Sequence, residues 1–407
     1  MSEELDIDIS DDDIVESVSE GISDVLSVEQ KKMVNTPTVP LKGGDWKDVE
    51  LTDAEVTDSL NITAGLTDFV KDTIKLDQGT GVVETLPTGI DILDTYLGGG
   101  WGCGTLSLIV GMPGTFKSSI LGQTIGTSQI KYRGKLLSTF HDSENAMTTE
   151  RLQDMGAKYP PIKPYTDVTI ESVFKTIEAI SAYKITNKIR EIPSIVAWDS
   201  IANTTTEYEL NMDEIDPNKA TGLKARILSA VLPRYVSKMK NNNISLIAVN
   251  QLRDKIDMGI FKTANDLKYL GGKIMPGGKS LMFNAFHLLH LTQKSDLGHD
   301  KYGFNGFVLE AKCVKNKLFP PNIPFKLLVD FNSGVSNFWT NYQFLVDTNK
   351  IKSGSWNSFA ADDSMKFRTK DAKNMYDSNE KGFKDLFDSE VKSTIQSDII
   401  DVYKPTA

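Results

Sequence analysis

Cysteine is scarce in this sequence: Cys103 and Cys313 are the two among 407 residues. Two thiols so far apart exclude a disulfide framework and a zinc site of clustered ligands, and they fit a reducing compartment. No run approaches the ~18 uninterrupted apolar residues that a membrane-spanning helix requires. The first ten residues, MSEELDIDIS, are acidic where a secretory signal is basic and then apolar. We therefore expect a cytoplasmic protein without a membrane partner.

Positive charge is missing from residues 1–30, which hold eleven acidic side chains and no Lys or Arg. The whole chain has 55 acidic and 45 basic residues, so the remainder has 44 acidic and 45 basic ones, a charge of about +1. The net charge of −10 therefore does not exclude a local nucleic-acid site. The acidic segment is serine-rich and has no aromatic residue, a composition that predicts disorder.

Apolar, β-rich runs alternate with stretches of helical spacing from about residue 82 onward. Such strands, separated by enough residues for crossover helices, predict an α/β fold with a mostly parallel twisted sheet flanked by helices. A helix is expected over residues 223–240, with a kink at Pro233, and a weaker helical pattern covers 382–395. The expected strands are 106–111, 135–140, 194–198, 244–250, 286–292, 307–314 and 325–331.

The stretch GMPGTFKS nearly matches the phosphate-binding loop G-x-x-x-x-G-K-[ST], but Phe116 stands where the motif has glycine. It lies between a strand ending at Val110 and the helix-compatible SSILGQTIG, so backbone N–H groups and a helix N-terminus would converge on an anion. Lys117 would reach the β- and γ-phosphates, and the Ser118 hydroxyl would bind Mg²⁺. A plain strand-to-helix turn is the alternative. The expected nucleotide-binding residues are Gly111, Met112, Pro113, Gly114, Thr115, Phe116, Lys117, Ser118 and Ser119.

Carboxylates follow two of the expected strands. Asp199 ends SIVAWD, and an aspartate at that place commonly supports the magnesium ion of a phosphate loop. Glu144 closes TFHDSE and could orient the water that attacks a γ-phosphate. Solvated carboxylates at strand ends are the alternative explanation.

A basic, glycine-punctuated stretch follows the strand 244–250. Gln251 could reach the γ-phosphate and transmit the nucleotide state to this stretch. Residues 251–279 carry six basic and three acidic side chains with two glycine pairs, which suits a nucleic-acid backbone. An ordinary surface loop remains the alternative. Further on, Lys315 and Lys317 of VKNK have the local appearance of a solvated lysine pair.

Taken in this order, the motifs resemble those of RecA-family recombinases, and more narrowly those of the UvsX-type recombinases of bacteriophages. The resemblance spans roughly residues 82–335. UvsX-type loops also have phenylalanine before the lysine, so Phe116 is expected to be a subgroup trait, whereas NQLR is closer to the RecA type. The motifs are LPTGIDILDTYLGGG, GMPGTFKS, FHDSENAMTTERLQDMG, VAWDS, VNQLRDKI, MPGGKSLMFNAF and VKNK.

The resemblance implies a DNA-dependent ATPase that forms helical filaments on single-stranded DNA and catalyses pairing and strand exchange with a homologous duplex. Its role would be recombination, repair and recombination-dependent replication, in the host cytoplasm if the chain is viral. ATP and Mg²⁺ would lie between neighbouring subunits, and single-strand-binding and mediator proteins are candidate partners.

The resemblance also implies roles for single residues. Glu144 would activate water, Gln251 would link the γ-phosphate to DNA, and Lys315 and Lys317 would reach the γ-phosphate of a neighbouring subunit. Arg151 stands where relatives have a tyrosine on the adenine ring, and a guanidinium can also stack there.

DNA would contact two loops by the same resemblance, at about residues 203–222 and within 252–276. Single-stranded DNA would be bound without sequence preference and with marked salt dependence, and double-stranded DNA would be the second substrate. An apolar side chain would separate base triplets. The expected contacts are Arg253 and Lys255 to phosphates, Ile256 as the wedge, and backbone N–H groups of Gly277 and Gly278.

Four segments are expected: an acidic segment over 1–30, an oligomerisation arm or small subdomain over 31–80, a RecA-like ATPase and DNA-binding core over 81–340, and a small C-terminal element or tail over 341–407. Two other functions stay open. One is a hexameric RecA-fold replicative helicase or circadian-clock-type ATPase, and the other is a recombination mediator whose ATP site regulates assembly.

Overall fold

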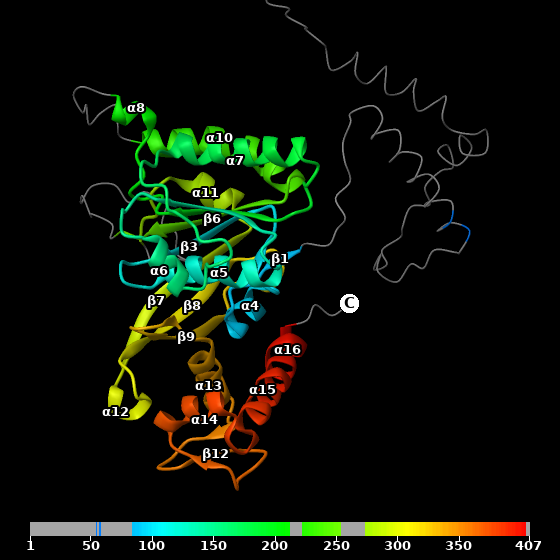
Figure 1. The fold of residues 1–407 in the computed structure, drawn as a ribbon, viewed down its shortest axis with the longest axis vertical. Coiled ribbons are helices and arrows are strands. Elements are labelled where there is room, and N and C mark those ends of the chain that lie inside the picture. Colours follow the sequence, from blue (N-terminus) through cyan, green and yellow to red (C-terminus); the bar gives the residue numbers. More distant parts are fainter. Residues whose placement is uncertain (1–53, 55–56, 58–83, 212–221, 254–272, 404–407) are drawn as a thin grey trace, which may run out of the picture. The chain divides into compact units, whose positions relative to one another are not determined.

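The computed structural model describes residues 54, 57, 84–211, 222–253 and 273–403. The chain divides after residue 82, and every element below belongs to the unit Val83–Ala407 (Figure 1). The expected acidic segment, nearly all of the expected arm, residues 212–221 of the first expected DNA loop and residues 254–272 of the second lie outside the described residues.

An eight-stranded sheet forms the centre of this unit, with the strand order β10-β9-β8-β7-β3-β6-β5-β4. The five strands from β7 to β4 in that order run parallel, and β8, β9 and β10 are antiparallel. The predicted α/β fold with a mostly parallel sheet is confirmed. The strands are β3 (Leu106–Gly111), β4 (Leu137–Asp142), β5 (Ser194–Asp199), β6 (Ile244–Gln251), β7 (His287–Leu297), β8 (Gly306–Lys315), β9 (Pro324–Asp330) and β10 (Gly334–Val335).

Helices cover both faces of the sheet. Successive side chains of a strand point to opposite faces, so each strand contributes to a buried core on either side. In β3, Ile109 packs in one buried cluster, whereas Leu108 and Val110 pack in the other. Helices α7, α10 and α11 lie together on the second face (Figure 1). The helices of this core are α4 (Asp91–Leu97), α5 (Lys117–Lys131), α6 (Thr149–Asp154), α7 (Ile170–Thr186), α8 (Glu207–Leu210), α10 (Leu223–Asn241) and α11 (Lys279–Asn284).

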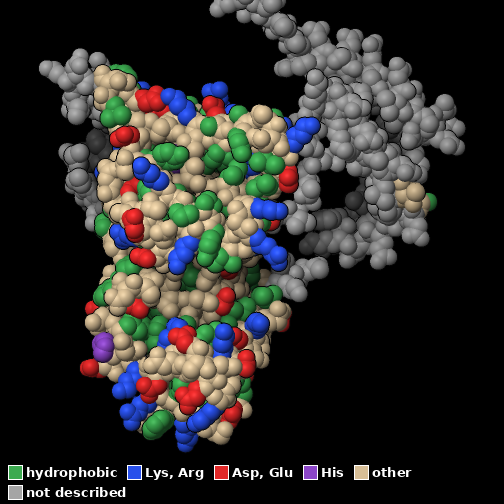
Figure 2. All heavy atoms as spheres, in the orientation of Figure 1, with side chains coloured by type: hydrophobic (Ala, Val, Ile, Leu, Met, Phe, Trp, Pro, Cys, Tyr) green, Lys and Arg blue, Asp and Glu red, His purple; other side chains and the backbone are tan. Residues whose placement is uncertain are grey.

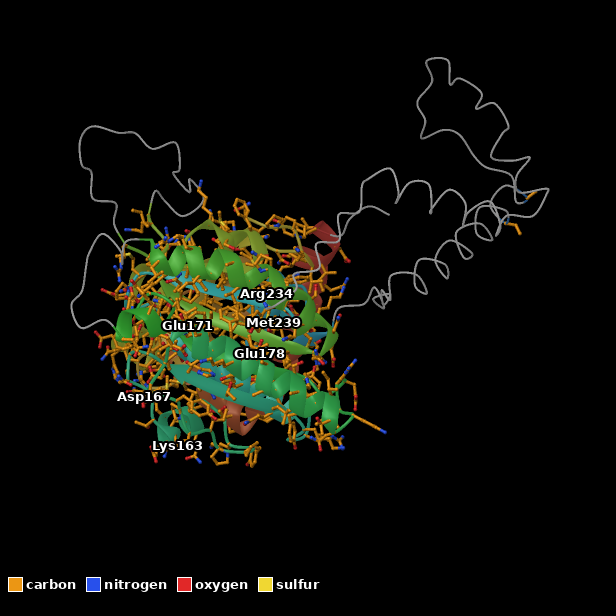
Figure 3. The ribbon with its side chains drawn as sticks, turned by 90° about the horizontal axis from the view of Figure 1, so that it is seen from above. Lys163, Asp167, Glu171, Glu178, Arg234 and Met239 are labelled. Carbon is orange, nitrogen blue, oxygen red and sulfur yellow. The ribbon has the colours of Figure 1, made fainter. Side chains whose placement is uncertain are left out.

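The long helices α7 and α10 pack side by side. Figure 3 shows Glu178 of α7 beside Arg234 of α10, and the Glu178 carboxylate accepts a hydrogen bond from Tyr235 Oη at 2.5 Å. Helix α10 continues through Pro233, the residue at which the sequence predicts a kink. A short antiparallel pair of β1 (Thr85–Leu86) and β2 (Trp101–Gly102), with α4 between them along the chain, precedes the sheet.

Two expected strands differ from the observed ones by more than one residue at an end. β4 begins at Leu137 and ends at Asp142, because His141 and Asp142 pair with Trp198 and Asp199 of β5 although both are polar. β7 continues to Leu297, beyond its apolar part, because after a register shift at residues 294–295 it pairs again with β8 through Asp296 and Leu297. In both cases backbone pairing, rather than hydrophobicity, sets the end of the strand.

The C-terminal residues have a buried core of their own, rich in aromatic side chains such as Phe338, Tyr342, Phe359 and Phe383. In α15 the buried residues recur every three or four positions, as on one face of a helix. The surrounding elements are α12 (His299–Tyr302), α13 (Asn337–Asp347), β11 (Ile351–Lys352), β12 (Asn357–Phe359), β13 (Lys366–Phe367), α14 (Ala372–Ser378), α15 (Phe383–Thr394) and α16 (Asp401–Tyr403).

Charges of both signs are mixed over the face of the unit that Figure 2 displays. Of the helices in the described part of the chain, none combines the length and the apolar character needed to cross a membrane.

Candidate nucleotide-binding site

The loop between β3 and α5 has the backbone of a phosphate-binding loop. Gly114 has a φ of +80°, and a Cβ there would meet nothing within 4 Å, so the loop is open on that side. Phe116 has a φ of 53°, in the left-handed region that favours glycine. Its ring lies edge-on to Phe307 with the centroids 5.7 Å apart. The loop therefore keeps the conformation that glycine would allow, and a ring contact holds the phenylalanine in place.

Lys117 begins α5 and is buried at the base of the loop. Its Nζ donates hydrogen bonds to Met112 O at 2.7 Å and to Thr115 Oγ1 at 3.3 Å. Burial lowers the pKa of Lys117 to about 8, and the charges of Asp199 and Glu144 oppose that change. An anion bound in the loop would supply the counter-charge that this ammonium group has only in part.

Asp199 ends β5 and is 4% exposed. Burial raises the pKa of its carboxyl group to about 6, and a hydrogen bond from the Ser118 side chain opposes the change. The structure therefore brings together the two residues expected to hold Mg²⁺. No cluster of three or more His, Cys, Asp or Glu among the described residues could hold a metal by itself. A divalent cation here would need further oxygen ligands, which the phosphates of a nucleotide provide.

Glu144 lies where three neighbouring strands end. Its Oε1 accepts hydrogen bonds from Ser200 Oγ at 2.7 Å, Asn203 Nδ2 at 3.0 Å and Gln251 Nε2 at 2.6 Å. The buried Asp142 carboxylate accepts from the Glu144 backbone N–H at 3.0 Å and fixes the turn that carries it. The expected pair Glu144 and Gln251 is thus in direct contact.

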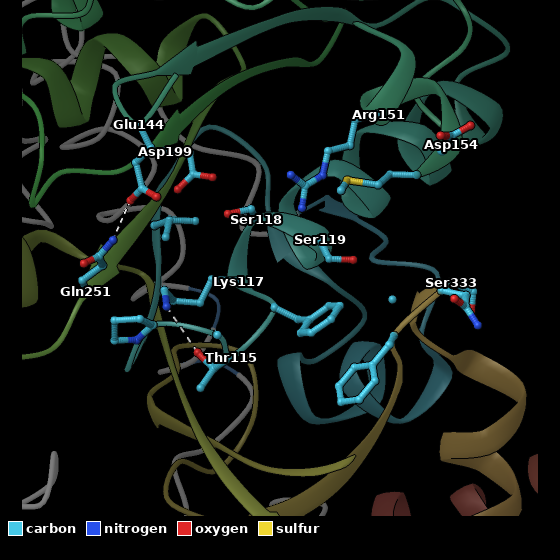
Figure 4. Close-up of a pocket in the computed structure, with 18 residues that line it drawn as sticks. Thr115, Lys117, Ser118, Ser119, Glu144, Arg151, Asp154, Asp199, Gln251 and Ser333 are labelled. Carbon is cyan, nitrogen blue, oxygen red and sulfur yellow. Dashed lines mark hydrogen bonds between the residues drawn. The ribbon is translucent and has the colours of Figure 1, made fainter. Parts of the chain in front are cut away.

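A cavity of about 590 Å³ opens beside the loop (Figure 4), a volume in the range of small-molecule sites. The residues expected at a nucleotide site line this cavity, including Arg151, except Gly111 and Met112. Several lining residues were not predicted, and they come from α6, β6 and the β9–β10 turn. The residues missed are Asp154, Met155, Val249, Phe331, Asn332, Ser333 and Gly334.

The expected DNA loop after β6 has a closed stem. Arg253 and Ile274 exchange two backbone hydrogen bonds, of 3.0 and 2.9 Å, and Asn250 Nδ2 donates to Pro276 O at 2.7 Å. Gly277 and Gly278 both have positive φ, and Gly278 is the residue before α11. The expected contacts Lys255 and Ile256 lie outside the described residues.

Lys315 and Lys317 do not line the cavity of their own subunit. Lys315 Nζ donates to the backbone oxygens of Met282 at 2.9 Å and Phe283 at 2.6 Å, near the end of α11. Lys317 Nζ lies 5.6 Å from the centre of the Phe286 ring. Within one subunit these two lysines are therefore structural.

A family model and individual proteins of known sequence both match this chain, and both point to the same family. The model of the RecA N-terminal domain matches residues 66–336. The chain is similar to the RecA protein of Ehrlichia ruminantium, 27% identical over 333 residues, covering 81% of this chain and 86% of that protein. It is also similar to the RecA proteins of Treponema denticola, 26% identical over 284 residues, and Tropheryma whipplei, 27% identical over 290 residues.

These two matches cover 69% and 70% of this chain but 64% and 61% of the relatives, so the chain spans less than two thirds of their length. Among solved structures, a crystal structure of the RadB recombinase aligns with a TM-score of 0.42 and 18% identity, covering 62% of this chain and 98% of that one.

Proposed function

The chain belongs to the RecA family, whose N-terminal domain model matches more than half of it, and we propose that it is a DNA-dependent ATPase with recombinase activity. It would polymerise as a helical filament on single-stranded DNA and catalyse pairing and strand exchange with a homologous duplex. We place it with the UvsX-type recombinases of bacteriophages, in the host cytoplasm, with single-strand-binding and mediator proteins as candidate partners. Phe116 supports that placement, because UvsX-type loops also have phenylalanine before the lysine.

The observation that best supports the proposal is the 2.6 Å hydrogen bond between Gln251 and Glu144. Glu144 stands at the nucleotide cavity, and Gln251 is two residues before Arg253, where the stem of the expected DNA loop closes. A single contact thus joins the group that would orient attacking water to the segment that would bind DNA. Hydrolysis and DNA binding would be coupled through it.

The cavity residues fit ATP and Mg²⁺. When bound, ATP supplies the transferable γ-phosphate, and Mg²⁺ neutralises charge that develops on it. The open loop at Gly114 and the N-terminus of α5 offer backbone donors for phosphate oxygens. Ser118 and Asp199 would hold the cation, Lys117 would stabilise the phosphates, and Glu144 would orient the attacking water.

Completion of the site would require a second subunit. Lys315 and Lys317 point to backbone oxygens and a ring of their own subunit, not to its cavity. In the proposed filament, the two lysines would contact the γ-phosphate bound by the neighbour and stabilise the transferring group. DNA would be contacted by Arg253, Lys255, Ile256, Gly277 and Gly278.

The test is electron microscopy of the full chain with single-stranded DNA and a slowly hydrolysed ATP analogue, together with ATPase rates. Helical filaments and a severalfold rise of hydrolysis on adding DNA are expected, with both lost in Lys117→Ala and unchanged in Lys163→Ala, an exposed lysine outside the cavity lining. Closed rings would favour the helicase alternative. A hydrolysis rate that does not change when DNA is added would refute the proposed coupling between hydrolysis and DNA binding.

A further inference from the structure

Arg151 projects from the short helix α6 into the nucleotide cavity. Thr148 caps this helix, and its Oγ1 accepts a hydrogen bond from the Arg151 backbone N–H at 3.2 Å. The guanidinium itself donates one hydrogen bond, from Nη1 to Ala146 O at 3.3 Å. Within the described part of the chain it has no carboxylate partner, so most of its N–H groups are available to a ligand.

The guanidinium is directed toward the phosphate end of the cavity. Figure 4 shows Arg151 reaching across from α6 toward Ser118 and Ser119, at the start of α5, while Asp154 lies further along the same helix. Helix α5 has 15 residues, and its N-terminus with Lys117 already favours an anion. Arg151 therefore adds a second cation on the side of this anion site that faces α6.

The cavity also contains an aromatic surface for a base. Phe331 lines it from the β9–β10 turn and is 55% exposed. The ring is held by Phe307, whose centroid lies 5.7 Å away. The base of a bound nucleotide could therefore stack on Phe331 and would not need to stack on Arg151.

We propose that Arg151 binds the phosphate chain of the nucleotide rather than stacking on its base. The planar fork of a guanidinium matches two phosphate oxygens and forms charge-assisted hydrogen bonds with them. The pocket then selects a polyphosphate strongly and a particular base weakly. This inference rests on the nucleotide site proposed above, and it names the part of the nucleotide that the site recognises.

The two possible roles of Arg151 predict different affinities for a ligand that has phosphates but no base. If Arg151 binds phosphate, its loss weakens ATP, GTP and inorganic tripolyphosphate alike. If it stacks on the base, its loss weakens the nucleotides and leaves tripolyphosphate unchanged. Lysine retains the charge without the planar fork, so in the first case Arg151→Lys should recover part of the affinity for tripolyphosphate that Arg151→Gln loses.

The experiment uses the full chain with Mg²⁺ and no DNA, and each ligand displaces a fluorescent ATP analogue. We expect Arg151→Gln to weaken all three ligands by a similar factor of about tenfold or more, the effect of losing a hydrogen bond between charged groups. Arg151→Lys should bind all three ligands more tightly than Arg151→Gln, because it keeps the charge, and less tightly than the wild type, because it lacks the fork. Arg234→Gln, on the exposed side of α10, is the matched control and should change nothing.

Two results would overturn the inference: a loss confined to ATP and GTP, or equal affinities of Arg151→Gln and wild type for all three ligands. A wild type that fails to bind tripolyphosphate would also overturn it. Thermal unfolding of each variant verifies that it is folded. Because no DNA is present, this outcome does not depend on whether filaments form on DNA. The recombinase proposal can therefore be refuted while the contact between Arg151 and phosphate is supported, and the contact can be refuted while the recombinase proposal is supported.

Discussion

Phe116 offers a direct test of how this loop tolerates the missing glycine. Its backbone has a φ of 53°, which costs a residue with a Cβ about 1 kcal/mol relative to glycine. Its half-buried ring packs edge-on against Phe307. Complete removal of a buried phenylalanine ring costs about 3–5 kcal/mol, so loss of this half-buried one should cost about 2 kcal/mol.

Two substitutions separate these contributions. Phe116→Ala loses the ring and keeps the unfavourable φ, so it should be about 2 kcal/mol less stable than the wild type. Phe116→Gly loses the ring but relieves the backbone, so it should be only about 1 kcal/mol less stable. Urea unfolding with equal slopes for the three proteins measures both differences. A glycine variant at least as stable as the wild type, or equal stabilities of the two variants, would refute the reasoning.

Three further substitutions follow from the site. Burial raises the pKa of Asp199 to about 6 from its ordinary 3.8, so the native state loses stability as pH rises from about 4 through 6. At pH 8, the free energy of unfolding of Asp199→Asn, measured with urea, should therefore exceed that of the wild type by about 1–3 kcal/mol. Near pH 4 the two proteins should be equally stable. The variant should also lose Mg²⁺-dependent hydrolysis. Gly277→Ala would place a Cβ 2.5 Å from Leu281 Cδ1 at a φ of +90° and should cost about 2 kcal/mol in the same assay. Gly298→Ala, where a Cβ meets nothing within 4 Å, should stay within about 0.5 kcal/mol and is its control. Lys315→Ala should depress hydrolysis on single-stranded DNA by about a hundredfold and leave ATP binding by isolated subunits intact; lost binding would show that the lysine acts within its own subunit.

The sequence predicted the central strands because they are buried on both faces and are apolar almost throughout. β3, β5 and β6 follow the expected bounds within a residue. Parallel strands bring their carboxyl ends to one edge of the sheet, so the order of strands and motifs along the chain was enough to predict Asp199 and Glu144 beside the loop.

The opposite wall of the cavity could not be predicted in this way. Gly334 lies so close to α5 that an added Cβ would collide with Ser119 Oγ, and Gln123 Nε2 donates to Val335 O at 2.8 Å. These contacts join residues more than 200 positions apart. The local sequence around Phe331 indicates a turn, but only the order of the sheet determines which helix the turn meets.

The residues of the C-terminal core could not be identified from the sequence for a related reason. Its aromatic residues are separated by polar stretches, so the composition after residue 350 indicates little burial. Phe338, Phe359 and Phe383 nevertheless belong to one buried core, to which α13, β12 and α15 contribute one each. The sequence indicates the helical spacing of apolar residues in α15, but it does not indicate which of the short elements contact one another.

Helix α11 has contacts at both ends that bear on the proposed filament. Gly278, at its start, lies two residues after Pro276, which accepts a hydrogen bond from Asn250 beside Gln251. Near its other end, the backbone oxygens of Met282 and Phe283 accept hydrogen bonds from Lys315. Lys315 Nζ has three N–H donors, so it can keep both bonds and offer the third to a neighbour's phosphate. In the proposed filament, Lys315 would therefore connect one end of α11 to the neighbour's nucleotide, while the nucleotide of the same subunit acts on the other end.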